Sequence, residues 1–377
     1  TGIGTTKLHT LFRQHYHTTP AAYLNRIRIA AACRLLADPK RQVGEVAYAV
    51  GYESLSAFHD NFRKATGLSP SDYQHIGTTF TLSLPENYLA WVALKLLGRD
   101  PDSKTERVEG RHAVKAVALP LADGSQPVVI HLDFEDQRVA CRVESAQALD
   151  TSALHAAHAV ILRMLGFGSN PVPFERQIAT RPDLVGLIEG RSGLRIPLSA
   201  DLFEGITWAI VGQQVNLAFA FKMRRALAEL CGTPVAESVS GLYVHPTPER
   251  VAALDYSDLT ARQFSRMKAE YLIDTARLLV SGDLSIDSQG CATQIEKRLH
   301  AVRGLGPWSV NYIMMRALGF ADCVPLGDTG LSTSLHRFFA LDHRPERDEV
   351  GTLMEPFAPF RSLATYHLWM SLGVTPA

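Results

Sequence analysis

Apolar residues recur at every third or fourth position over two long regions of the chain, and this spacing predicts amphipathic helices. In residues 1–76 the recurring positions are Leu8, Leu11, Phe12, Leu24, Ile27, Ala31 and Leu35. From residue 151 onward the same spacing runs through 153–166, 201–232, 268–282 and 294–319. Both regions are therefore expected to be helical.

Residues 78–150 follow a different period. Apolar and polar positions largely alternate in the short runs 80–85, 112–119, 127–134 and 138–144, a pattern typical of strands. A helical pattern at 87–98 lies between the first two runs. This region predicts a small α+β unit with an antiparallel sheet. We therefore expect a mainly α, multidomain fold divided into residues 1–76, 78–150 and 151–377.

The composition describes an ordinary globular protein, with 46% hydrophobic and 20% charged residues. No apolar run approaches the ~18 residues of a membrane-spanning helix, so we expect no membrane partner. The five cysteines are scattered without a C-x-x-C pair, which speaks against a thiolate zinc site, an iron–sulfur cluster or disulfides. We expect no metal site and a reducing, cytoplasmic environment.

The net charge of zero conceals an asymmetry between the two parts of the chain. Residues 1–76 contain nine Lys and Arg against five Asp and Glu, a net charge of +4, so the remainder carries −4. A small basic module attached to a larger body is compatible with nucleic-acid binding by that module.

A helix-turn-helix is predicted at 43–73, in "VGEVAYAVGYESLSAFHDNFRKATGLSPSDY". One helix ends at Gly51, and Ser54 or Ser56 can cap a second helix that carries Phe58 and Phe62. This stretch resembles the second helix-turn-helix of AraC-type regulators, and residues 18–36 resemble their linking helix. The alternative is a generic helical bundle.

Residues 5–16, "TTKLHTLFRQHY", resemble the recognition helix of the first helix-turn-helix in the same regulators. The helix that normally supports it is missing, so we expect the module to be truncated at its N-terminus. The resemblance implies that outward side chains of the two recognition helices contact an operator. These candidate contacts are Thr6, His9, Arg13, Ser56, His59 and Arg63.

A second DNA-binding element is predicted around "RGLGP", residues 303–307, which joins two helical patterns. Gly304 and Gly306 permit backbone angles that other residues avoid, Leu305 points inward, and Pro307 suits the first helical turn. The free N–H groups at the start of the second helix suit a phosphate. We therefore expect a helix-hairpin-helix in which residues 303–306 (Arg303, Gly304, Leu305, Gly306) hold a DNA backbone. The hairpin carbonyls could also hold a cation, and no other cofactor is expected.

Asp328 lies in "PLGDTGL", directly before a helical pattern. The simplest interpretation is an N-cap, whose carboxylate accepts N–H bonds at the start of a helix. The same environment favours the charged form of a carboxylate. A charged carboxylate can stabilise the oxocarbenium-like sugar that forms when an N-glycosidic bond breaks.

Together, the hairpin and the Gly-Asp element resemble the helix-hairpin-helix DNA glycosylase superfamily. Within it, residues 80–371 resemble the inducible, AlkA-type 3-methyladenine DNA glycosylase II, and the whole chain resembles the Ada-type adaptive-response fusions of bacteria. The resemblance implies all-α helix-hairpin-helix glycosylase domains, with Asp328 as the catalytic aspartate. It also implies a base pocket of Trp308, Tyr312 and Trp369, whose electron-rich faces attract a positively charged alkylated base.

Two further roles follow from this resemblance. The family's wedge residue, which fills the gap left by a flipped nucleotide, falls on Gln214. Bifunctional relatives carry a lysine on the second hairpin helix, and the run from Trp308 to Gly319 has none, so a monofunctional enzyme is expected.

The resemblance thus implies a hydrolase that excises 3-methyladenine-like bases from double-stranded DNA and leaves an abasic site, acting in base excision repair. We expect a monomer in the bacterial cytoplasm, associated with the nucleoid. One alternative is a transcriptional regulator of the alkylation response whose glycosylase fold is catalytically silent. Another is a glycosylase for oxidised or mismatched bases, against which the missing lysine and cysteine cluster speak.

Overall fold

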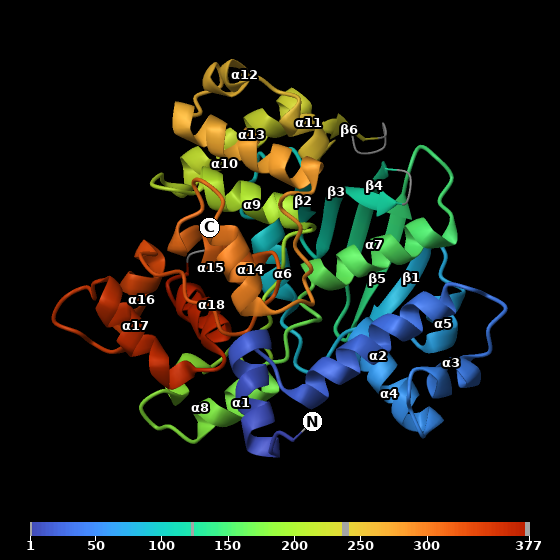
Figure 1. Cartoon of the computed structure of the whole chain (residues 1–377). Helices are drawn as coiled ribbons and strands as arrows, with labels where there is room; N and C mark the ends of the chain where they lie inside the picture. The colour runs from blue at the N-terminus through green and yellow to red at the C-terminus, as the bar shows by residue number, and fades with distance from the viewer. Residues whose placement is uncertain (1, 122–123, 236–240, 374–377) are drawn as a thin grey trace.

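The structure, a computed structural model, describes residues 2–121, 124–235 and 241–373, and most of them are helical (Figure 1). The mainly α, multidomain fold expected from the sequence is confirmed. The N-terminal helices are α1 (Thr5–Tyr16), α2 (Pro20–Leu36), α3 (Val43–Ala49), α4 (Leu55–Thr66) and α5 (Pro70–Gln74).

The helix-turn-helix has the local chemistry that the sequence predicts. The α3 helix ends before Gly51, whose φ of 87° is a left-handed angle that glycine adopts at little cost. Ser54 is the N-cap of α4, since its side chain accepts the N–H of Ala57 at 3.4 Å. Phe58 and Phe62 are fully buried. The two helices therefore form the predicted pair, and Ser54 rather than Ser56 is the cap.

A five-stranded antiparallel sheet follows, in the order β1-β5-β4-β3-β2. Its strands are β1 (Thr79–Ser83), β2 (Glu106–Glu109), β3 (His112–Leu121), β4 (Gly124–Phe134) and β5 (Arg138–Glu144), and α6 (Ala90–Leu97) lies between β1 and β2 in sequence. The long pair β3 and β4 sets Val117 opposite Val128. The strand β2 was not predicted because its sequence, "ERVE", is short and mostly charged.

The remaining elements are almost all helices. They are α7 (Thr151–Met164), α8 (Val172–Ala179), η1 (Val185–Leu187), α9 (Leu202–Val211), α10 (Leu217–Cys231), β6 (Thr233–Pro234), β7 (Tyr243–Val244), α11 (Pro248–Ala252), α12 (Tyr256–Thr260), α13 (Arg266–Ser281), α14 (Ala292–His300), α15 (Pro307–Arg316), α16 (Thr329–Phe338), α17 (Arg347–Met354), η3 (Glu355–Phe357) and α18 (Arg361–Ser371). The helical pattern at 201–232 is interrupted at 212–216, because Asn216 caps a new helix, α10, by accepting the N–H of Phe219.

The helix-turn-helix and the sheet share one hydrophobic core. A single cluster of buried residues contains Phe58 and Phe62 of α4, Ile130 and Leu132 of β4, and Ile161 of α7. Across this contact the imidazole Nε2 of His158 lies 2.8 Å from the backbone oxygen of Thr66. Figure 1 shows α7 lying across the sheet, with α2 to α5 beside it. The second helix-turn-helix is thus not separated from the sheet by a linker.

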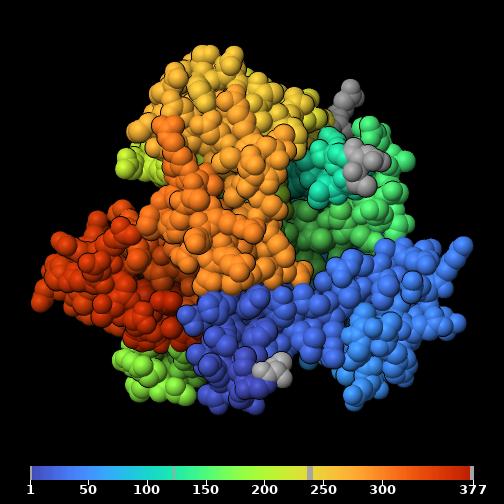
Figure 2. Space-filling model, viewed as in Figure 1, coloured from blue at the N-terminus to red at the C-terminus, as the bar shows by residue number. Residues whose placement is uncertain are grey.

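The first helix packs elsewhere. In Figure 2 the N-terminal residues contact the segment that carries α14 and α15. The imidazole Nδ1 of His15 lies 3.1 Å from the hydroxyl of Thr293 on α14, and Nδ1 of His17 accepts the N–H of Asp322 at 3.2 Å. The two candidate recognition helices, α1 and α4, therefore rest on different parts of the protein.

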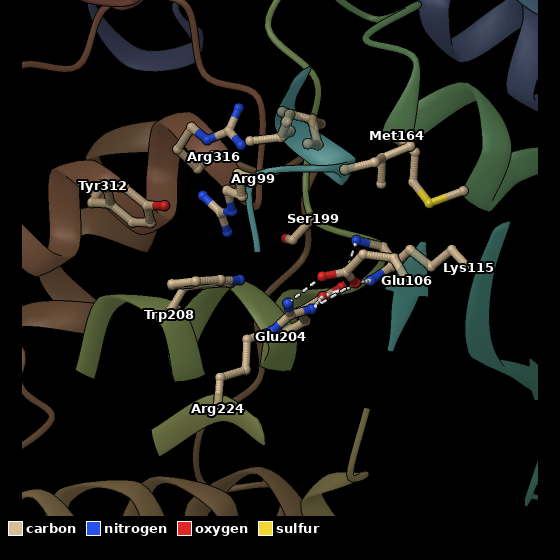
Figure 3. Close-up of a pocket in the computed structure, with 15 residues that line it drawn as sticks. Arg99, Glu106, Lys115, Met164, Ser199, Glu204, Trp208, Arg224, Tyr312 and Arg316 are labelled. Carbon is tan, nitrogen blue, oxygen red and sulfur yellow. Dashed lines mark hydrogen bonds and ion pairs between the residues drawn. The ribbon is translucent and has the colours of Figure 1, made fainter. Parts of the chain in front are cut away.

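A buried ionic cluster joins the sheet to the helices (Figure 3). Lys115 of β3 donates to Glu106 at 2.7 Å and to Glu204 of α9 at 2.8 Å. Arg224 of α10 pairs with the same two carboxylates. All four side chains are about 5% exposed or less, and the neighbouring cations hold the pKa of Glu204 at about 2 despite its burial. Because a broken buried pair leaves an uncompensated charge, this cluster fixes α9, which leads into the site, against the sheet.

Candidate active site

The carboxylate of Asp328 is held by three N–H donors. Asp328 is the N-cap of α16, and its Oδ1 accepts the backbone N–H of Leu331 at 2.7 Å. The indole Nε1 of Trp369 donates to the same oxygen at 2.9 Å, and the indole Nε1 of Trp308 donates to Oδ2 at 3.0 Å. An ionised carboxylate has about four acceptor positions, so these donors orient it and leave acceptor capacity for a substrate or a water molecule.

Gly330, for which the sequence predicted no role, leaves space for this arrangement. A Cβ atom at this position would lie 3.1 Å from Oδ1 of Asp328 and 3.4 Å from Cδ1 of Trp369. A larger residue would therefore crowd the tryptophan where it reaches the carboxylate. The "GDTG" sequence carried this signal, because a second glycine follows the aspartate by two positions.

The three predicted pocket rings contact one another. The rings of Trp308 and Tyr312 are stacked at 5.3 Å and 23°, and Tyr312 and Trp369 lie 6.5 Å apart between centroids. Trp308 and Trp369 line the groove described below, and Tyr312 lines a separate cavity of about 40 Å³. Both Trp369 and Tyr312 are buried, at 4% and 3% exposed, so Trp308 presents the more accessible ring to the groove. Figure 3 shows its hydroxyl turned toward Arg99. Tyr312 is thus placed to support the two tryptophans from behind.

Asp328 and the two tryptophans lie in an open groove of about 1410 Å³. Three segments supply most of its lining: the loop 212–217, the hairpin 300–309 and the turn 326–330. Residues of α13, among them Lys268 and Tyr271, also line it, as do Arg347 and Trp369. The groove therefore brings together the carboxylate, the aromatic pair, the hairpin and the predicted wedge residue.

The hairpin between α14 and α15 has the predicted form with one correction. Gly304 has φ 91°, and a Cβ there would lie 2.2 Å from the ring of Tyr271, so glycine is required. Gly306 has an ordinary φ of −76°, so the expected special backbone angle is wrong at this position. A Cβ on Gly306 would meet nothing within 4 Å, which keeps the backbone accessible from the groove. Leu305 is buried and Pro307 opens α15, as predicted.

Arg303, predicted to contact the DNA backbone, has two partners on α13. Its guanidinium lies 3.0 Å from a carboxylate oxygen of Glu270 and 5.5 Å from the ring centroid of Tyr271. The side chain is still 67% exposed, so it can exchange these partners for a phosphate.

The predicted wedge residue, Gln214, is exposed in the loop between α9 and α10 and has φ 52°. A left-handed angle is costly for glutamine and is found where the surrounding structure enforces it. Two neighbours, for which the sequence predicted no role, provide that support. Gln213 donates from Nε2 to the backbone oxygen of Gly304 at 2.8 Å, and Lys268 donates to the backbone oxygen of Gln213 at 2.8 Å. A buried lysine on a helix gives no signal in sequence, because its partners are backbone atoms.

The predicted operator contacts lie on the surfaces of α1 and α4. Thr6, Arg13, Ser56 and Arg63 are exposed, and His9 and His59 are half-buried. None of these six is among the described residues that line the groove. The protein therefore presents two candidate DNA surfaces that share no residue.

Within the part of the chain that the structure describes, no three His, Cys, Asp or Glu side chains are grouped to hold a metal ion. One hairpin carbonyl considered for a cation, that of Gly304, accepts a hydrogen bond from Gln213. No helix in the described ranges has the length and apolar character needed to cross a membrane.

Comparison with known proteins agrees with this architecture. Residues 1–76 match the helix-turn-helix domain model, and residues 207–359 match the model of HhH-GPD superfamily base excision DNA repair proteins. "Putative DNA-3-methyladenine glycosylase YfjP" of Bacillus subtilis is 34% identical over 51% of this chain and 67% of its own length. "Probable bifunctional transcriptional activator/DNA repair enzyme AlkA" of Mycobacterium tuberculosis is 27% identical over 94% of this chain and 71% of its own length.

These two relatives and a DNA-3-methyladenine glycosylase of Bacillus subtilis are matched over 60% to 71% of their own lengths. Among solved structures, a 3-methyladenine DNA-glycosylase from Archaeoglobus fulgidus has the same fold, with a TM-score of 0.64 over 77% of this chain and 97% of its own, at 20% identity. By these matches the chain belongs to the HhH-GPD superfamily of base excision DNA repair proteins and carries an AraC-type helix-turn-helix module at residues 1–76.

Proposed function

We propose that this protein is a monofunctional DNA glycosylase that excises alkylated, 3-methyladenine-like bases and leaves an abasic site. One observation carries the proposal. The carboxylate of Asp328 is oriented by the indole N–H groups of two tryptophans that line an open groove beside a helix-hairpin-helix. The groups that would recognise the base and the group that would assist the chemistry are thus in direct contact.

The proposed reaction is hydrolysis of the bond between the base nitrogen and C1′ of the sugar. The bond's electron pair leaves with the alkylated base, which is positively charged before cleavage and neutral after it. The sugar becomes oxocarbenium-like, and the negative charge of Asp328 stabilises it. A water molecule then adds to C1′ and loses a proton. Because alkylation already makes the base a good leaving group, one carboxylate is sufficient.

Base selection is assigned to Trp308 and Trp369. A cationic base within about 6 Å of an aromatic face is attracted by the ring's quadrupole. Their hydrogen bonds to Asp328 fix the orientation of both indole rings, and Tyr312 stacks on Trp308. An undamaged, neutral base would gain less from the same faces.

The groove contains a lysine, Lys268, and its position bears on whether the enzyme cuts the strand. A lysine nucleophile must present a free amine to C1′ to form a Schiff base. The Nζ atom of Lys268 instead donates to the backbone oxygens of Ile210, Val211 and Gln213 at 2.6 to 3.0 Å. We therefore propose that the enzyme releases the base by hydrolysis and does not cut the strand. Borohydride should then trap no covalent enzyme–DNA adduct, and an enzyme-dependent adduct would refute the proposal.

The direct test is release of methylated bases from alkylated duplex DNA by the wild type and by Asp328→Asn. The amide keeps a capping oxygen but lacks the charge, so excision should fall by about 100-fold or more while the fold persists. Near-normal excision by Asp328→Asn would show that another group supplies the chemistry.

The parts of the chain receive separate roles in this proposal. Residues 1–76 would bind an operator through α1 and α4, residues 78–150 would support the glycosylase, and residues 151–377 would bind and hydrolyse the damaged site. The protein would act as a monomer on the bacterial nucleoid in the cytoplasm, without a metal cofactor. The exposed positions of Arg13, Ser56 and Arg63 support the operator role.

A further inference from the structure

Lys268 is a buried cation held entirely by backbone oxygens. It lies in the first turn of α13, is 9% exposed, and donates to Ile210, Val211 and Gln213 at 3.0, 2.6 and 2.8 Å. These oxygens belong to the C-terminal end of α9 and the residue that follows its cap. The ammonium thus lies among the last carbonyls of α9, at the negative end of the helix dipole, and the oxygen of Ile210 also accepts the N–H of Gln213 at 3.3 Å.

The same loop is tied to the DNA-backbone hairpin from its other side. The amide Nε2 of Gln213 donates to the backbone oxygen of Gly304 at 2.8 Å and to the hydroxyl of Ser309 at 2.9 Å. The ring of Tyr271, one turn after Lys268 on α13, packs against the bare face of Gly304. One helix, α13, therefore supports both the loop 212–216 and the hairpin.

We infer that Lys268 is a positioning residue for strand opening, which holds the loop 212–216, and with it Gln214, at a fixed place relative to the DNA-backbone hairpin. This inference rests on the proposed function and on the wedge role that the family resemblance implies for Gln214, which would enter the duplex beside a flipped nucleotide. A wedge can separate stacked bases only if its own support does not yield. The hairpin grips the backbone, and the network through Gln213 fixes the wedge to that grip.

The chemistry of the site requires a charged lysine. Three oxygens converge on one nitrogen, and only the protonated amine has three hydrogens to donate. Burial lowers the pKa of Lys268 to about 8, so the ammonium form still predominates at pH 7. The exposed, left-handed Gln214 follows directly after the last oxygen of the set, so freeing these oxygens would release the wedge first.

The test compares the wild type with Lys268→Met, which keeps the length of the side chain and removes its donors. Lys222→Met, on the exposed surface of α10, removes the same charge elsewhere and is the control. Each protein is assayed on one alkylated base in two settings: paired within a duplex, and unpaired in a single strand. Lys268→Met should lose at least tenfold in excision of the paired base and less than threefold on the unpaired one, while Lys222→Met should match the wild type on both.

Amide hydrogen exchange of residues 210–216 gives a second readout that needs no activity. Exchange there should be faster in Lys268→Met and unchanged in Lys222→Met. The milder Gln213→Ala, which removes only the bridge to the hairpin, should change both readouts in the same direction if Lys268→Met does not fold. Equal losses on the two substrates, or unchanged exchange in the loop, would overturn the inference. If the wild type releases no base from either substrate, the proposed function fails, and the exchange data still decide whether Lys268 holds the loop.

Discussion

The indole N–H of Trp369 donates a 2.9 Å hydrogen bond to Oδ1 of Asp328 across 41 positions of sequence. This contact joins the aromatic residues of the groove, Trp308 and Trp369, and the carboxylate into one structural unit. A base that shifts the tryptophan also shifts the donor that orients the carboxylate. In the proposed function, base recognition and bond cleavage would therefore respond to the same movement, which a carboxylate held by backbone alone would not allow.

Trp369→Phe should separate the two roles of this tryptophan. The phenyl ring keeps an aromatic face but lacks the N–H, and a hydrogen bond to a charged group contributes roughly 1.5–3 kcal/mol. We expect kcat to fall by about tenfold or more, with a small change in KM. Tyr366→Phe, which alters the ring next to Trp369 without touching the carboxylate, is the control. A change confined to KM would mean that the N–H does not act through Asp328.

The two hairpin glycines should fail in different ways. Gly304→Ala places a methyl group against the ring of Tyr271 at a left-handed φ, so it should destabilise the fold by about 1–3 kcal/mol or more and lower Tm. Gly306→Ala should leave Tm unchanged but weaken binding to undamaged duplex DNA, because its methyl group would stand where the hairpin is proposed to bind a phosphate. Gly306→Asp should weaken binding further. Wild-type affinity of both Gly306 variants would show that the hairpin does not grip DNA.

Stability should fall at mildly acidic pH because of His158, which is 2% exposed at the contact with Thr66. Burial lowers its pKa from 6.5 to about 4, so between these values the unfolded chain binds a proton that the folded protein does not. The contribution is complete above about pH 6.5 and is lost as pH falls toward 4, a total of roughly 3 kcal/mol. Urea unfolding at pH 7.5 and 5 measures it. His158→Gln should flatten this dependence, and an unchanged slope would contradict the assignment.

The operator-binding role of the helix-turn-helix should be testable by substitution of its surface residues. Deletion of the module should instead change the stability of the whole protein. Arg63→Ala should reduce preference for an operator and leave base excision unchanged, because Arg63 is exposed on α4 and does not line the groove. Deletion of residues 1–76 would expose the core formed by Phe58, Phe62 and the sheet, so the truncated protein should be less soluble and less stable. A deletion variant with wild-type Tm would show that the shared core is dispensable. Gel-shift assays measure the operator preference of Arg63→Ala, and excision assays on the same preparations measure its activity.

The sequence predicted most of the helices and strands, but few of the contacts between them. Spacing predicted the helix-turn-helix, the sheet and the hairpin, and resemblance to a family proposed roles for Asp328 and the aromatic residues. It did not reveal that the indole N–H groups of Trp308 and Trp369 converge on Asp328, since that depends on where α15, α16 and α18 meet. The roles of Gln213 and Lys268 were also hidden, because both act through backbone atoms that no residue pattern marks.

The shared core of Phe58 and Ile130 likewise escaped prediction, although each half of it was expected to be apolar. Periodicity shows which face of an element is buried and not which partner covers it. The same limit applies to β2, which has no alternating apolar pattern and is held instead by the ion pairs of Glu106 with Lys115 of β3 and Arg224 of α10.

That ionic cluster also restricts how the family can vary. Glu106, Lys115, Glu204 and Arg224 balance one another away from water, so replacing any one of them leaves a stranded charge in the interior. A neutral path between sequences must then change opposite charges together, or exchange the whole set for apolar side chains. The four positions are therefore expected to covary among descendants of this chain. Substitutions in the sheet (β2 and β3) and in the helices α9 and α10 are then constrained by one another.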